Sequence, residues 1–86
     1  MFYVYLLQSK KDFSIYIGLT SNLRKRFKEH NQGKTRSTKP KRPFVLIYYE
    51  AYRNKTDARK RELELKKKAQ RKEILLRQLE NSLFKK

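Results

Sequence analysis

Apolar residues along the chain fall into three short runs that have the length and composition of β-strands. Residues 2–8 are apolar at nearly every position, which predicts a strand covered on both faces, and residues 44–52 form a third strand that is again largely apolar. Residues 14–19 alternate, with isoleucine and leucine on one side. The polar residues 9–13 have the length of a hairpin loop. The pattern therefore predicts a β-hairpin followed by a separate third strand.

Helical signals begin directly after the predicted hairpin. Three residues that cap helices well, Thr20, Ser21 and Asn22, precede a segment that we expect to be helical to about Asn31. Gly33 follows at the place where a glycine commonly ends a helix. One helix is therefore expected between the second and third strands.

Two more helices are expected after the third strand. Thr56 followed by Asp57 is a typical helix start, and this helix should run to about Lys68. A last amphipathic helix is expected from about Arg71 to Leu83. Its apolar residues recur at helical spacing, at Leu76, Leu79 and Leu83. The order ββαβαα predicts an α+β fold, a small three-stranded antiparallel sheet flanked by helices.

Length and composition limit the kinds of protein this can be. A chain of 86 residues is expected to form a single domain over residues 1–86, with its core over about residues 2–77. It has no cysteine and a single histidine, which excludes disulfide frameworks, cysteine zinc sites and multi-histidine metal sites. No apolar run is long enough for a transmembrane helix, and the start does not resemble a signal peptide, so we expect a cytoplasmic location.

The charge indicates the kind of partner. Lysine and arginine number 24 against 8 acidic residues, a formal net charge of +16 that is spread over both halves of the chain. A polyanion such as a nucleic acid is the expected partner, because each neutralised phosphate releases condensed counterions. A membrane surface fits less well, since no basic segment also has a broad apolar face. The candidate phosphate contacts lie on the first helix and in the basic loop 34–43: Arg24, Lys25, Lys28, Lys34, Arg36, Lys39, Lys41 and Arg42.

Two tyrosines stand out in the predicted hairpin. Tyr5 and Tyr16 lie on strands that are expected to pair, so both rings can share one face of the sheet. An aromatic pair that only stabilises the sheet is one interpretation, because strands favour tyrosine. Gly18 favours another, since a glycine inside a strand often marks the close approach of a ligand or another backbone.

The first expected helix has a stripe of mixed chemistry. Leu23, Arg26, Phe27 and His30 stand at i, i+3, i+4 and i+7 and therefore share one side. Leu23 and Phe27 need burial, which carries Arg26 and His30 toward the sheet. Taken singly, His30 is typical of a helix C-terminus favoured by the dipole, and Arg26 is typical of a border residue. Their shared stripe makes a catalytic role an equal alternative.

Glu62 lies on the apolar side of the second expected helix. Ala58 and Leu65 are its neighbours at i−4 and i+3, so the carboxylate is expected to face inward. One interpretation is a hard divalent cation held by this carboxylate, water and substrate phosphate. The other interpretation, slightly favoured by the pattern alone, is an ion pair with Arg59 or Lys66.

Five strings of residues together match a known family. In order they are Tyr3-Val4-Tyr5, Tyr16-Ile17-Gly18, the segment 23–34, Arg42-Pro43-Phe44 leading into Leu46-Ile47-Tyr48, and Ala58 to Glu62 with Leu65-Lys66. In these strings the sequence resembles the GIY-YIG nuclease superfamily. It is most similar to the small stand-alone members, which are single domains like that of excision nuclease C. The resemblance runs from Tyr3 to about Arg77.

The resemblance implies a role for each residue singled out above. Tyr5 and Tyr16 match the motif tyrosines, and Arg26, ten residues beyond Tyr16, matches the arginine that contacts the scissile phosphate. His30, fourteen residues beyond Tyr16, stands where the family has histidine or tyrosine, and Glu62 matches the ligand of a single Mg²⁺ or Mn²⁺ ion. The implied activity is metal-dependent hydrolysis of DNA phosphodiester bonds in repair, recombination or processing, with Tyr5 as general base.

The chain also departs from the family pattern. Tyr3 stands where the first motif has glycine, Leu19 stands where repair-type members have lysine, and no counterpart of their late asparagine is found. The alternative is therefore a nucleic-acid-binding module of the same fold with little or no activity. RNA is a less favoured partner, because the chain lacks an aromatic RNA-binding strand motif. A preference for branched or nicked DNA, or a partner protein of unknown identity, would supply targeting.

Overall fold

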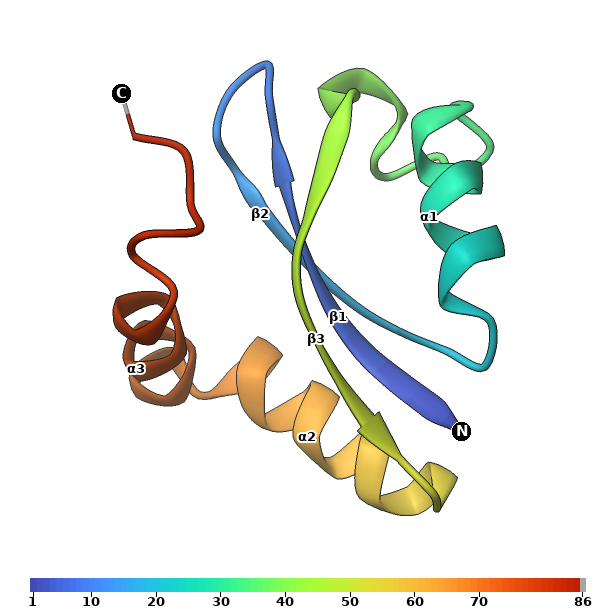
Figure 1. Ribbon diagram of the computed structural model, residues 1–86, viewed down its shortest axis with the longest axis vertical. Coiled ribbons are helices and arrows are strands. Elements are labelled where there is room, and N and C mark those ends of the chain that lie inside the picture. Colours follow the sequence, from blue (N-terminus) through green and yellow to red (C-terminus); the bar gives the residue numbers. More distant parts are fainter. Residues whose placement is uncertain (86) are drawn as a thin grey trace.

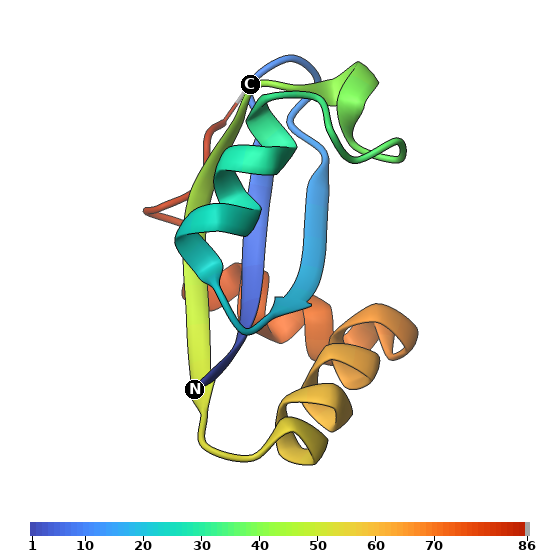
Figure 2. The same ribbon diagram turned by 90° about the vertical axis from the view of Figure 1, so that its right-hand side faces the viewer.

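The computed structural model describes residues 1–85 and has the element order that the sequence predicts. The elements are β1 (Phe2–Ser9), β2 (Ile15–Thr20), α1 (Leu23–Asn31), a 3₁₀ turn (Lys39–Lys41), β3 (Phe44–Tyr52), α2 (Lys55–Lys67) and α3 (Ala69–Gln78). The fold is α+β, with one open antiparallel sheet and helices on both of its faces (Figures 1 and 2). None of the helices within residues 1–85 is both long enough and apolar enough to cross a membrane.

Strand β1 forms the centre of the sheet, whose order is β2-β1-β3 with both pairings antiparallel. Val4 and Leu6 are buried on the face that packs against α2 and α3, which we call the α2 face. Tyr5 and Leu7 are buried on the opposite face, the α1 face, where α1 lies in front of the sheet in Figure 2. The prediction that the first strand is covered on both faces is confirmed.

A β-bulge in β3 changes which residues face α1. The pairing of β1 with β3 shifts between Leu6 and Leu7, and Ile47 is the extra residue without a partner on β1. Before the bulge, Leu46 packs on the α1 face. After it, Tyr49 lies beside Leu46 at the same face, because the extra residue shifts the alternation by one position.

Helix α1 begins and ends where its sequence signals stand. The Asn22 side chain accepts a hydrogen bond from the backbone N–H of Lys25, at 3.1 Å, and caps the first turn. Gly33, just past the helix, has a φ of +77°, the left-handed region that a side chain disfavours. The helix therefore stops in time for the basic loop to turn back toward β3.

The bounds of the other two helices differ from the prediction. Helix α2 begins two residues earlier, because the cap is Asn54, whose side chain accepts from the backbone N–H of Thr56 at 2.8 Å. Helix α3 ends at Gln78, although Leu83 still packs on the core. The chain beyond α3 returns to β1 instead, where the Gln8 side chain holds the backbone of Phe84 by bonds of 2.7 and 3.3 Å.

Four polar residues on the α2 face form what we call the Glu50 cluster: Tyr48, Glu50, Tyr52 and Arg61. Glu50 accepts hydrogen bonds from the hydroxyl of Tyr48, at 2.6 Å, and from that of Tyr52. Arg61 of α2 donates to both carboxylate oxygens at 3.0 and 3.1 Å. The cluster therefore ties β3 to α2 with a carboxylate whose charge is matched and whose hydrogen bonds are filled.

Candidate active site

The Tyr5 side chain lies on the α1 face and is buried. It extends across Gly18, its partner on β2, so closely that a Cβ atom at position 18 would lie 2.3 Å from the Tyr5 hydroxyl oxygen. A side chain there would displace the ring. The glycine that the sequence analysis singled out thus makes room for a neighbouring tyrosine, which fixes the Tyr5 hydroxyl above β2.

Tyr16 lies diagonally from Tyr5 on the same face, as the hairpin register predicts. The centroids of the two rings are 6.2 Å apart. The Tyr16 ring also packs edge-on against His30, with 4.9 Å between centroids. The two tyrosines and the histidine therefore form one aromatic group between α1 and β2.

His30 is fully buried in the last turn of α1 and has a hydrogen-bond partner at each ring nitrogen. The Tyr5 hydroxyl lies 2.9 Å from Nε2, and the Thr38 hydroxyl lies 2.8 Å from Nδ1. Thr38 donates its own proton to the carbonyl oxygen of Thr35, at 3.3 Å. We therefore assign the proton of His30 to Nδ1, which donates to Thr38, while Nε2 accepts from Tyr5.

The pKa values of this pair are shifted in opposite directions. Burial, and after it the charge of Arg26, lowers the pKa of His30 to about 4. Burial, and after it Tyr16, raises the pKa of Tyr5 to about 12. At neutral pH both side chains are uncharged, and the helix dipole that favours a histidine cation at this position is outweighed by burial.

Arg26 lies beside Tyr5, at the border between the core and solvent. Burial disfavours its charge, but the hydroxyl of Tyr5 and the carboxylate of Glu29 favour it, and its pKa is raised. Glu29 lies 3.4 Å away and is the partner in an ion pair at the helix surface. The guanidinium is thus a permanent cation next to the Tyr5 hydroxyl, on the helical stripe that the sequence indicates.

Glu62 is buried on α2, between Ala58 and Leu65, with 4% of the residue exposed. Its carboxylate binds two cations: Arg59 pairs with Oε1, and Lys66 lies 3.0 Å from Oε2. The ion-pair interpretation therefore describes the structure, with both candidate partners engaged at once. Such a carboxylate is neutralised in place and is not exposed as solubilising charge.

Lys66 connects Glu62 to the tyrosines. Its ammonium nitrogen lies 5.9 Å from the centroid of the Tyr16 ring, within the range of a cation–π contact. The negative charge of Glu62 also contributes to the raised pKa of Tyr5. Among the contacts within residues 1–85, none joins Glu62 directly to Tyr5 or Arg26. The structure thus brings Tyr5, Tyr16, Arg26 and His30 together. Glu62 is connected to this group through Lys66, which contacts both Glu62 and Tyr16.

The Glu62 carboxylate is a hard oxygen donor of the kind that binds a divalent cation. The residue borders an open depression at the end of β2, which Thr20 and Ser21 also line. Within the part of the chain that the structure describes, no three histidine, cysteine or acidic residues cluster as a complete ligand set. Mg²⁺ commonly accepts one or two carboxylates and completes its coordination with water and phosphate, so the donor present fits it.

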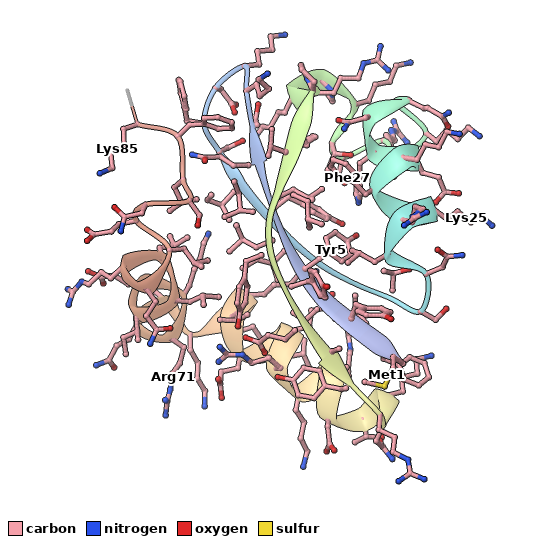
Figure 3. All side chains as sticks on the ribbon, in the orientation of Figure 1. Met1, Tyr5, Lys25, Phe27, Arg71 and Lys85 are labelled. Atoms are coloured by element: carbon pink, nitrogen blue, oxygen red, sulfur yellow. The ribbon has the colours of Figure 1, made fainter. Side chains whose placement is uncertain are left out.

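All eight predicted phosphate contacts are exposed. Three lie on α1 and five in the following loop, and Figure 3 shows Lys25 pointing away from the sheet. None of the eight takes part in an ion pair within residues 1–85. Arg42 has a second role, because its guanidinium covers Gly33 at a distance that leaves no room for a side chain there.

Thr38 is the part of this site that the sequence did not reveal. It is buried in the middle of a basic loop, where its hydroxyl fixes the orientation of His30. A threonine among lysines and arginines resembles an ordinary loop residue, and only the tertiary fold brings it beneath the histidine. The position of Lys66 over Tyr16 was likewise not predicted, although its ion pair with Glu62 was.

Comparison with known proteins shows the family. The model of the GIY-YIG catalytic domain matches residues 1–85. The chain belongs to the GIY-YIG family. Its relatives within the GIY-YIG family include a UPF0213 protein of Staphylococcus haemolyticus, 45% identical over 65 residues, which are 74% of this chain and 78% of the relative. A UPF0213 protein of Clostridium perfringens is 46% identical over 68 residues, 78% of this chain and 72% of the relative.

A solved structure agrees with the GIY-YIG fold described above. The solution NMR structure of a UPF0213 protein from Bacillus halodurans has a TM-score of 0.57 and 37% sequence identity, covering 92% of this chain and 85% of that one. The names of these relatives state no activity. The resemblance to small stand-alone GIY-YIG proteins is confirmed, and it places the chain in a nuclease family.

Proposed function

We propose that the protein is a DNA endonuclease that hydrolyses phosphodiester bonds with one Mg²⁺ or Mn²⁺ ion held by Glu62. The observation that carries this proposal is the Tyr5–His30 hydrogen bond of 2.9 Å beside the permanent cation Arg26, in a chain of a nuclease family. A protonated tyrosine, a neutral base and a cation at one place are the groups needed to activate water at a phosphate.

Tyr5 is the proposed general base. It can take a proton from water only if its own proton leaves, and His30 Nε2 already accepts that proton in a hydrogen bond. As the water proton moves to the Tyr5 oxygen, the hydroxyl proton moves to Nε2, and the resulting imidazolium keeps its Nδ1 bond to Thr38. The charge of Arg26 favours negative charge on the Tyr5 oxygen as its proton leaves, and it disfavours the imidazolium at His30. Tyr16, on the open side of the group, would orient the water.

Arg26 would also stabilise negative charge on the phosphate. In-line attack on a phosphodiester increases negative charge on the non-bridging oxygens, and a cation fixed at that place stabilises this charge more than it stabilises the ground state. Arginine suits this position because its planar fork matches two phosphate oxygens. The eight exposed basic residues on α1 and its following loop would hold the DNA backbone on either side.

A divalent cation at Glu62 would polarise the phosphate and stabilise the leaving oxygen. For this exchange Glu62 must release Arg59 and Lys66, whose side chains are 57% and 41% exposed and therefore have solvent to move into. Because two cations compete for the carboxylate, we expect weak metal binding without DNA and tighter binding when phosphate supplies further oxygen ligands.

The test is a nicking assay with supercoiled plasmid and branched DNA in Mg²⁺ or Mn²⁺. Glu62→Ala should abolish nicking, because the metal ligand is lost. Glu64→Ala is the matched control: this residue is two positions along the same helix, pairs with Arg61 at 2.6 Å, and should nick as the unaltered protein does. Nicking that persists unchanged in Glu62→Ala would assign the activity to a contaminant.

A second candidate function is a nucleic-acid-binding module without useful cleavage. The double ion pair at Glu62 favours it, since the carboxylate is already neutralised by the protein's own cations. Leu19, in place of a lysine, favours it as well. This candidate predicts strong binding that weakens steeply with salt, and intact strands in the nicking assay. Binding that is indifferent to salt would contradict it.

A further inference from the structure

An open groove lies on the α1 face, apart from the Tyr5–His30 pair. It has a volume of about 480 Å³ and runs between the start of α1 and strand β3. Phe27 and Leu46 form its floor, and Tyr3 and Tyr49 form one wall. We call it the aromatic groove. Arg24 stands at its rim, and none of the roles proposed above uses its aromatic residues.

Tyr49 is the unusual residue of this groove. It is 52% exposed, although it is a large aromatic side chain in the middle of a strand. Its ring meets Tyr3 edge-to-face, with 5.9 Å between centroids and 69° between planes, so one flat face of Tyr49 is left without an aromatic partner. A half-exposed ring beside an apolar floor provides a stacking surface more than it contributes to the core.

The charge around the aromatic groove indicates what covers it. Arg24 at the rim, Lys25 and Lys28 are exposed and are not engaged in ion pairs within the described residues. A ligand that fits must combine planar apolar faces with negative charge, which is the chemistry of a nucleotide. Aromatic stacking of bases within a positively charged groove is how proteins hold single-stranded nucleic acid.

The aromatic groove is continuous with the proposed cleavage site. Ser21, in the turn between β2 and α1, lines both the aromatic groove and the depression that Glu62 borders. Tyr49 is also the cross-strand partner of Tyr5 on β1. A strand whose phosphate lies at Glu62 therefore has its neighbouring base within reach of the groove, across a single turn of the chain.

We propose that the aromatic groove binds one unpaired base of the DNA strand next to the phosphate to be cut. Paired bases are stacked inside a duplex and present only their edges, so a ring can stack on Tyr49 only when its base is unpaired. The substrate class is then DNA with a single-stranded nucleotide at the cleavage point, such as a flap, a gap or a frayed end. This inference rests on the proposed function, which places the cut phosphate at Glu62.

The test compares the binding of flapped and fully paired DNA of the same length, without added metal. The unpaired base at the flap junction is 2-aminopurine, whose fluorescence falls when it stacks on an aromatic ring. Tyr49→Ala should weaken binding of the flapped DNA by about 5- to 100-fold and restore the fluorescence, while duplex binding stays unchanged. Tyr49→Phe keeps the ring and should behave as the unaltered protein does.

Two controls separate stacking from damage to the fold. Phe84→Ala removes another exposed aromatic side chain, one held beside Gln8 on the α2 face of the sheet, and should leave both affinities within 2-fold. If Tyr49→Ala melts well below the unaltered protein, Tyr49→Leu keeps apolar volume on β3 without a ring and carries the same expectation. The dependence of binding on salt should be the same for all Tyr49 variants, because no phosphate contact is changed.

The result that overturns the inference is an equal loss of flapped and paired DNA binding in Tyr49→Ala, or no loss at all. Tighter binding of an RNA flap than of the DNA flap would also overturn it. Its failure differs from failure of the proposed function, since binding is measured without cleavage. If Tyr49 favours flapped over paired DNA in a protein that never nicks DNA, the proposed nuclease activity is wrong and the proposed role of the aromatic groove holds. If the protein nicks DNA but Tyr49→Ala does not change its preference for flapped DNA, the reverse is true.

Discussion

Two tyrosine clusters lie on opposite faces of one small sheet, and they differ in how their hydrogen bonds are filled. In the Glu50 cluster a charged carboxylate accepts hydrogen bonds from Tyr48, Tyr52 and Arg61 together. On the α1 face, Tyr5 donates instead to the neutral ring of His30, and the nearby cation Arg26 is partly exposed. The first arrangement is closed and stabilises the fold, whereas the second retains a base and a cation that can still act on a substrate.

The acidity of the tyrosines does not distinguish the two clusters. Burial first, and then neighbouring groups, raises the pKa of Tyr48 and of Tyr52 to about 12, the same value as for Tyr5. The difference is the acceptor. The Glu50 carboxylate is charged and is shared by Tyr48, Tyr52 and Arg61, whereas His30 Nε2 is a neutral acceptor that faces the hydroxyl of Tyr5. A neutral proton acceptor beside the hydroxyl, more than a shifted pKa, is therefore what supports Tyr5 as the proposed general base.

The largest contrast is expected from removing one hydroxyl in each cluster. Tyr5→Phe should lower the nicking rate by about 100- to 10,000-fold, because the general base is lost. Tyr48→Phe removes a hydroxyl from the other cluster and should leave the rate unchanged. Each variant loses one buried hydrogen bond, which lowers the free energy of unfolding by about 1 kcal/mol, so stability is matched.

The measurement is the initial nicking rate at a temperature where thermal unfolding curves show both variants folded. Equal rates for Tyr5→Phe and the unaltered protein would remove Tyr5 as the base. A rate that falls in Tyr48→Phe as well would show that the two clusters are not separate in function.

A smaller effect, on stability alone, is expected from opening the Glu50 cluster. Glu50→Ala leaves Arg61 and two tyrosine hydroxyls without their acceptor, and we expect the free energy of unfolding to fall by about 2–4 kcal/mol. Glu73→Ala, which removes an exposed ion pair with Arg77, should change it by less than about 0.5 kcal/mol. Urea unfolding midpoints test both, and similar losses in the two variants would refute a stabilising role for the cluster.

The smallest expected effect is a dependence of stability on pH, and it comes from His30 on the α1 face. Since the pKa of His30 lies near 4 in the folded protein and near 6.5 when unfolded, the unfolded chain binds a proton that the folded chain does not. The free energy of unfolding should therefore fall as the pH drops from about 6.5 to 4, by about 1–3 kcal/mol. Above pH 6.5 the full stability is present.

His30→Gln isolates this contribution from the carboxylates that titrate in the same range. The glutamine amide can still hydrogen-bond to Tyr5 and Thr38 but has no proton to gain. Urea unfolding measured between pH 4 and 7 should show a smaller slope in the variant. Identical slopes would mean that His30 is not held neutral in the folded protein.

The sequence predicted that Tyr5 and Tyr16 share one face, because strand alternation and hairpin pairing are local and regular. It did not predict that the Tyr5 side chain itself lies over Gly18. It placed the start of α2 two residues late, since Asn54 and Thr56 are both capable caps and only the fold selects between them. Thr38 could not be found at all, because the burial of a loop residue depends on what α1 brings over it. The Glu50 cluster could have been predicted in part, because Tyr48, Glu50 and Tyr52 stand at alternate positions of β3 and therefore lie on one face of the sheet.

The extra residue Ile47 decides which face of the sheet each later residue of β3 joins. Side chains alternate between the two faces of a strand, so one bulged residue moves every residue after it to the opposite face from the one that simple alternation gives. If Ile47 instead paired with Leu6 in a regular ladder, Tyr49 would turn away from the aromatic groove and the charge of Glu50 would move to the side of Tyr5. The separation of the Glu50 cluster from the Tyr5–His30 pair therefore depends on the bulge at Ile47.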